Sequence, residues 1–118
     1  MSFIKLSSIY ASPASINNGD SLTLSYSISG DDDAQLEITY SLDSAYNIYF
    51  VLPDGQTTQM LPVERMVLDT PPMLVTKGVS ICKKSPLPGK DDYNYFDIKV
   101  SVADNTTSDS GNCNITIT

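Results

Sequence analysis

The stretch Ala11–Gly30, ASPASINNGDSLTLSYSISG, joins a proline, a polar turn and a run of alternating side chains. Every second residue from Ser21 to Ser29 is apolar: Leu22, Leu24, Tyr26 and Ile28. Successive side chains of a β-strand point to opposite faces, so this period of two places one face against a core and the other in water. The preceding Asn17–Asp20 offers residues that accept the positive φ of a turn. The stretch therefore predicts a turn followed by a half-buried strand, with Pro13 on an edge strand.

The same alternation recurs in segments 34–42 and 94–102. Its apolar positions are Leu36, Ile38, Tyr40 and Leu42 in the first segment and Phe96, Ile98, Val100 and Val102 in the second. Between them, Asp54-Gly55 predicts the turn of a hairpin, because Asp-Gly pairs adopt the backbone angles of tight turns. Segment 63–80 is compatible with one or two strands or with a short helical turn, and we favour strands.

A last alternating run, GNCNITIT at 111–118, completes seven to eight expected strands separated by Gly, Pro, Asn and Asp turns. Many short strands with regularly spaced turns are typical of an immunoglobulin-like sandwich. The length of 118 residues suits one domain. The sequence thus predicts an all-β fold, an immunoglobulin-like antiparallel β-sandwich that spans residues 1–118 as a single domain.

The opening stretch resembles the first hairpin of bacterial immunoglobulin-like modules, above all the cell-adhesion-related domains of bacterial surface proteins. The residues that carry the resemblance are Pro13, Ile16, Gly19, Asp20 and the alternating set from Leu22 to Ile28. The chain lacks the tryptophan of antibody-type domains, and its cysteines lie outside the second and sixth strands. The resemblance implies an adhesin, spacer or assembly domain.

Composition excludes several classes of function. Fourteen acidic against seven basic residues give a formal net charge of −7, which disfavours nucleic acids and anionic membranes as partners. Histidine is absent, so Ser-His-Asp and Cys-His mechanisms and the usual zinc ligands are excluded. A pair of carboxylates suffices for glycoside hydrolysis, but such enzymes also need a cleft, which a domain this small rarely has. We therefore predict that the protein is not an enzyme.

The sequence shows no secretory signal and no apolar run long enough to span a membrane. Three settings remain open at this point: a cytoplasmic or particle-associated protein, export by another route, or a fragment of a longer extracellular protein.

Cys82 and Cys113 are the only two cysteines. If they are oxidised, only one pairing exists, and the bridge would close a loop of the chain. The alternative is that both are small hydrophobic residues in a reduced protein.

Aspartates gather in two of the expected turns. These residues are Asp31, Asp32, Asp33, Asp104 and Asp109. In an immunoglobulin-like sandwich both turns emerge at one end, where carboxylates and the neighbouring Asn105 would offer the oxygen ligands of a calcium ion. Calcium is the only cofactor that the sequence suggests. The alternative is that aspartates simply favour turns and keep the surface soluble.

Tyrosines are numerous for a chain without tryptophan. Tyr46, Tyr49, Tyr93 and Tyr95 are candidate binding residues, because exposed tyrosines anchor protein partners or stack on sugar rings. The alternative is ordinary packing in the core. Four of the seven basic residues, Lys77, Lys83, Lys84 and Lys90, form a second candidate surface or, alternatively, guard an edge strand.

These observations predict a non-catalytic binding or structural module in adhesion or in the assembly of a larger surface or particle, with a protein partner or self-assembly. The alternative is a lectin-like, calcium-assisted carbohydrate-binding module.

Overall fold

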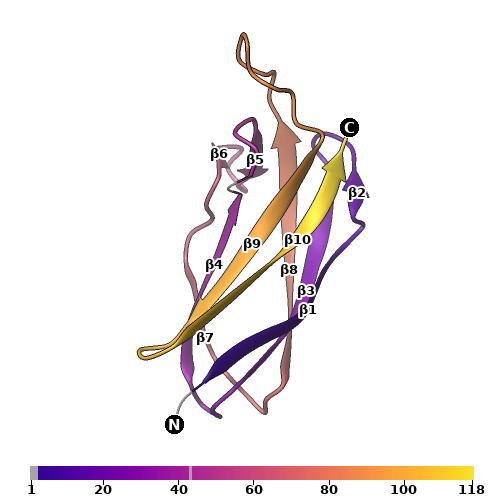
Figure 1. Cartoon of the computed structure of the whole chain (residues 1–118). Coiled ribbons are helices and arrows are strands. Elements are labelled where there is room, and N and C mark those ends of the chain that lie inside the picture. Colours follow the sequence, from indigo (N-terminus) through magenta and orange to yellow (C-terminus); the bar gives the residue numbers. More distant parts are fainter. Residues whose placement is uncertain (1–2, 43) are drawn as a thin grey trace.

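The computed structural model describes residues 3–42 and 44–118, which form ten strands and no helix (Figure 1). The strands are β1 (Ile4–Ser12), β2 (Ser15–Ile16), β3 (Ser21–Gly30), β4 (Gln35–Leu42), β5 (Ile48–Val51), β6 (Thr57–Thr58), β7 (Glu64–Val67), β8 (Met73–Lys83), β9 (Tyr95–Ala103) and β10 (Ser108–Ile117). The predicted all-β class is confirmed. The count exceeds the expected seven to eight strands by two or three, and β2 and β6 are too short to show any alternation. No described helix offers the length and apolar character of a membrane span.

The strands form two five-stranded sheets. The first has the order β1-β3-β8-β5-β6 and is antiparallel throughout. The second has the order β2-β10-β9-β4-β7 and is mixed, because β2 runs parallel to β10. The chain crosses from the first sheet to the second around Pro13 without reversing, which corrects the expectation of purely antiparallel pairing. The arrangement is consistent with a β-sandwich.

Both sheets contribute to one core, and the three alternating segments supply about half of it. All twelve apolar residues that the sequence places inward from Leu22 to Ile28, from Leu36 to Leu42 and from Phe96 to Val102 are buried. Leu24 on β3 and Ile98 on β9 are both 0% exposed and belong to the same cluster, although they lie in different sheets. The period of two in the sequence thus identifies the core correctly.

A hydrogen bond between two tyrosines crosses the middle of this core. The hydroxyl oxygens of Tyr26 on β3 and Tyr40 on β4 are 2.6 Å apart, and the ring centroids are separated by 6.4 Å in an edge-to-face arrangement. Burial raises the pKa of both hydroxyl groups above its ordinary value, so both stay neutral at physiological pH. Each hydroxyl is the other's hydrogen-bond partner inside the core.

The Asp54-Gly55 hairpin and segment 63–80 both contain strands. The hairpin expected around Asp54-Gly55 is formed by β5 and β6, with Phe50 opposite Thr58 and Gly55 at φ 89°. Segment 63–80 contains β7 and most of β8, so the preference for strands over a helical turn is confirmed.

The molecule is elongated, with extents of 50 × 25 × 24 Å. The loop between β8 and β9 projects at one end, and the β3–β4 and β9–β10 connections lie at the other (Figure 1). The two ends therefore present different loops to possible partners.

Candidate functional site

The candidate site is a group of three tyrosines at the end that carries the β8–β9 loop. Tyr46 follows β4, Tyr93 lies just before β9, and Tyr95 is the first residue of β9. The ring centroids of Tyr46 and Tyr93 are 6.0 Å apart with an interplanar angle of 79°, and those of Tyr93 and Tyr95 are 6.5 Å apart at 90°. Edge-to-face packing of this kind stabilises aromatic groups beyond their buried area. We call these three residues the tyrosine cluster.

The base of the β8–β9 loop is held by several polar contacts. The Leu87 amide donates to the Tyr46 hydroxyl oxygen at 2.9 Å, which ties the loop to the cluster. Lys83 Nζ lies 3.0 Å from Asp92 Oδ1 and donates to Asn94 Oδ1 at 2.9 Å. These contacts join the two ends of the loop to each other and the loop to Tyr46.

Part of this site remains accessible to a partner. Tyr95 is 60% exposed, and Leu87 on the projecting loop is 58% exposed. A hollow of about 490 Å³ lies beside them and is lined by Tyr46, Tyr93 and the loop residues 89–91. Large apolar side chains exposed on a rigid loop base are typical of recognition surfaces.

Tyr49, the fourth candidate tyrosine, lies apart from the cluster. It stands on β5 opposite Cys82, and Lys84 Nζ lies 4.3 Å from its ring centroid. Within the described residues it makes no ring contact with the other three. The sequence therefore identified three residues that the fold brings together and one that it does not.

The aspartates of the predicted calcium site do not converge. The pairing of Glu37 with Ala103 brings the two turns to one end of the molecule, as expected. There, however, Asp104 Oδ1 accepts the amides of Thr106 and Thr107, both at 2.7 Å, and these hydrogen bonds hold the pKa of Asp104 below its usual range. Asp109 Oδ2 accepts the Leu6 amide at 2.8 Å.

In the same way Asp32 Oδ1 accepts the amides of Asp33 and Thr70, at 3.1 and 3.3 Å. Across residues 3–42 and 44–118 no group of three or more acidic or cysteine side chains could hold a metal. The expected calcium ligands, Asp31, Asp32, Asp33, Asp104 and Asp109, therefore form no such group. Backbone amides bond to one carboxylate oxygen each of Asp32, Asp104 and Asp109. Their role matches the alternative of turn residues.

Calcium is accordingly expected to leave the melting temperature unchanged. We would compare thermal unfolding with about 5 mM calcium, enough for weak extracellular sites, and with a chelator. An ion present at ten times its Kd would stabilise the fold by about 1.4 kcal/mol and raise the melting temperature by about 4 °C or more. A rise of that size would contradict the assignment.

Of the two alternatives for Cys82 and Cys113, the structure has the reduced one, and both cysteines are free. Cys82 follows the fully buried Ile81 on β8, so its side chain points away from the core of the first sheet. Cys113 lies on β10 of the second sheet and packs against the core, where burial raises the pKa of its thiol. Side chains on opposite sides of a sheet cannot bridge.

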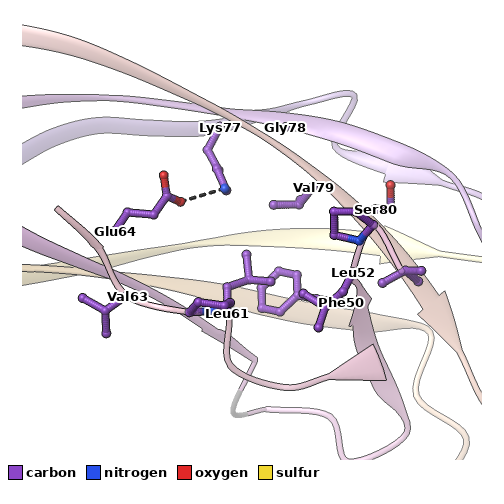
Figure 2. Close-up of a pocket in the computed structure, with 12 residues that line it drawn as sticks. Phe50, Leu52, Leu61, Val63, Glu64, Lys77, Gly78, Val79 and Ser80 are labelled. Carbon is purple, nitrogen blue, oxygen red and sulfur yellow. Dashed lines mark ion pairs between the residues drawn. The ribbon is translucent and has the colours of Figure 1, made fainter. Parts of the chain in front are cut away.

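A cleft of about 460 Å³ on the side of the molecule was not foreseen (Figure 2). It lies between the end of β5, residues 77–80 of β8 and residues 61–64 that lead into β7. At its mouth Lys77 Nζ and Glu64 Oε2 form an ion pair at 2.7 Å that joins the two sheets. One sequence feature could have indicated the cleft: Lys77 occupies an inward position of β8 between Val75 and Val79, where an apolar residue is expected.

No family model and no curated protein matches this chain. Among solved structures it is similar to the alkylpurine DNA glycosylase AlkC of Pseudomonas fluorescens, bound to DNA containing an abasic site analogue, at 16% identity and a TM-score of 0.51. That match covers 98% of this chain and 30% of AlkC, so the chain spans less than a third of that protein.

Two further structures give lower scores. The β-glucuronidase of Bacteroides uniformis has 14% identity and a TM-score of 0.45 over 97% of this chain and 13% of that one. The sporulation control protein Spo0M of Bacillus subtilis has 12% identity and a TM-score of 0.43 over 97% of this chain and 49% of that one. At this identity, the AlkC likeness concerns the fold alone, and the other two support no argument about function.

Proposed function

We propose that the chain is a non-catalytic binding module of the immunoglobulin-like class, which acts in adhesion or in the assembly of a larger surface or particle. Its partner is a protein, and the tyrosine cluster contacts it. The observation that carries this proposal is the exposure of Tyr95 and Leu87 beside two rings that are already packed edge to face.

The strand order supports the immunoglobulin-like part of the proposal. Immunoglobulin domains place their first, second and fifth strands in one sheet and their third, sixth and seventh in the other. Here β1, β3 and β8 are neighbours in the first sheet, and β4, β9 and β10 are neighbours in the second. The shorter β5, β6 and β7 extend the two sheets at their edges.

The chemistry of the cluster favours a protein over a sugar. Tyrosine supplies a large contact area with only two side-chain torsions to fix, which suits the centre of a protein interface. A sugar would instead stack on an open ring face. Mutual edge-to-face contacts occupy part of the ring faces in the cluster. Carbohydrate binding is therefore the competing outcome of the test.

The test places a photo-crosslinker at the cluster in the cells that make this protein. Tyr95→p-benzoylphenylalanine is expected to give a discrete crosslinked protein, whereas the same replacement at Asn112, an exposed residue of β10, gives none. Adding Tyr93→Ala removes the neighbouring ring. It should weaken the non-covalent complex by about 1–2 kcal/mol and so lower the yield of the crosslinked protein.

A glycan array with and without calcium completes the experiment. The proposal expects no bound glycan in either condition. Equal crosslinking from positions 95 and 112, or glycan binding that disappears with Tyr95→Ala, would overturn it.

A further inference from the structure

The two edges of β8 are paired to different extents. On one side β3 pairs with it from Met73 to Ser80. On the other side β5 pairs only with Ile81, Cys82 and Lys83. Within the described chain no other strand pairs with that second side, so residues 74–79 have an unpaired edge. We call these residues the open edge of β8.

The direction of the backbone groups along this edge follows from Ile81. The Ile81 amide donates to the Asp20 carbonyl at 3.0 Å, and its carbonyl accepts the Gly19 amide at 2.9 Å, so both groups point toward the side of β3. In an antiparallel ladder the direction alternates from one residue to the next. The backbone groups that point to the open side therefore belong to Leu74, Thr76 and Gly78. Those of Ser80 point the same way but flank the Phe50–Ile81 pair, so they belong to the ladder with β5.

The unforeseen cleft reaches the open edge at residues 77–79. Its walls combine residues 77–80 of β8 with apolar side chains of the facing segments, among them Phe50, Leu61 and Val63 (Figure 2). Val63 and Leu74 are 45% and 68% exposed. A row of free backbone groups next to an apolar groove is what strand addition requires, because the backbone binds an extended chain and the groove accepts alternate side chains.

The outer face of β8 is uncovered at the centre of the open edge. Gly78 carries no side chain, and no heavy atom lies within 4 Å of the position that a Cβ would occupy. Lys77 points inward, with its Nζ bound to Glu64 and 5.7 Å from the Tyr40 ring centroid. Glu64 thereby neutralises the charge of Lys77 within the sandwich. The Lys77 side chain does not cover the open edge.

Charge decides between a second copy and another protein as the occupant. Two copies would each bring a net charge of −7, so self-pairing would bring two acidic molecules together. A neutral or basic extended segment does not meet this repulsion.

We propose that the open edge of β8 binds an extended, neutral or basic segment of a partner protein, with apolar residues at alternate positions, as an additional strand of the first sheet. This surface is separate from the tyrosine cluster and does not depend on it.

The test uses the peptide Lys-Val-Thr-Val-Thr-Val-Lys, acetylated and amidated, with the whole chain in solution. We expect a Kd below about 1 mM and, at saturation, amide hydrogen exchange slowed about tenfold or more at Thr76 and Gly78. The amides of Val75, Lys77 and Val79 already face β3 and should change little. A control peptide with proline at the central valine lacks one donor and should not bind.

A variant of the chain tests the same edge. Thr76→Pro removes a donor on the open side while the bonds between β3 and β8 remain, since proline is tolerated on an unpaired edge. We expect at least a tenfold loss of peptide affinity with an unchanged β-sheet circular dichroism spectrum. Tyr95→Ala should leave peptide binding intact, which separates this proposal from the function of the cluster.

Three results would overturn the proposal. One is no protection at about 1 mM peptide, and another is equal binding of the proline peptide. The third is self-association without peptide that protects the same β8 amides, which would make a second copy the occupant.

Discussion

Leu24→Ala is expected to lower the free energy of unfolding by about 3–5 kcal/mol. Leu24 is fully buried at the centre of β3, between β1 and β8 and against the second sheet. Alanine removes apolar contacts on every side, and strands held in ladders on both edges cannot collapse into the cavity. Urea unfolding at neutral pH, followed by circular dichroism, measures the change.

The adjacent Thr23 offers a matched control. It lies on the exposed face of the same strand, so Thr23→Ala should change the free energy of unfolding by no more than about 0.5 kcal/mol. Similar values for the two variants would mean that β3 does not have one buried and one exposed face. The assignment of the core would then be wrong.

Removing either partner of the Tyr26–Tyr40 hydrogen bond is expected to cost about 1–3 kcal/mol. Tyr26→Phe and Tyr40→Phe each leave the other hydroxyl buried without its partner at 2.6 Å. The double variant removes both polar groups, so its loss should be smaller than the sum of the two single losses by about 1 kcal/mol or more. If the two single losses in the free energy of unfolding add up to the loss of the double variant, the hydrogen bond is contradicted.

This cycle should be measured near neutral pH. Because the pKa of each phenol is raised in the folded chain, its contribution is fully present below the unfolded value of about 10 and is lost as the pH rises toward the folded value. At neutral pH both hydroxyls are protonated in the folded and unfolded states. The measured coupling then reports the hydrogen bond itself.

The core could be predicted from the sequence because its signal is local. In β3, β4 and β9 each inward residue is apolar and most outward residues are polar, so a period of two suffices. In β8 the inward row is Val75, Lys77, Val79 and Ile81, and the lysine interrupts the pattern. Lys77 is tolerated there because Glu64 lies across the cleft, a contact that no local rule foresees.

The candidate sites depend on contacts between segments that are distant in the sequence. The fold brings three of the four tyrosines together but, in the part of the chain that the structure describes, assembles neither the calcium ligands nor a disulfide. Tyr93 and Tyr95 are near neighbours in sequence, but the contact of Tyr93 with Tyr46 requires the loop between β8 and β9 to fold back. The aspartate turns do reach one end, yet Asp109 is taken by the Leu6 amide from the far end of the sequence. Whether Cys82 and Cys113 can meet depends on which sheet β8 and β10 each join, and the sequence does not reveal this.

The crossing of the first segment from one sheet to the other has a mechanical consequence. Ile4 lies opposite Gly30 at one end of the long axis, and Ile117 lies opposite Ile16 at the other. Tension applied between these two points pulls β2 and β10 lengthwise past each other. The cross-strand bonds from the Thr116 amide to the Ala14 carbonyl and from the Thr118 amide to the Ile16 carbonyl, both 3.0 Å, then share the load at once. Such a shear clamp resists stretching far better than strands that unzip bond by bond.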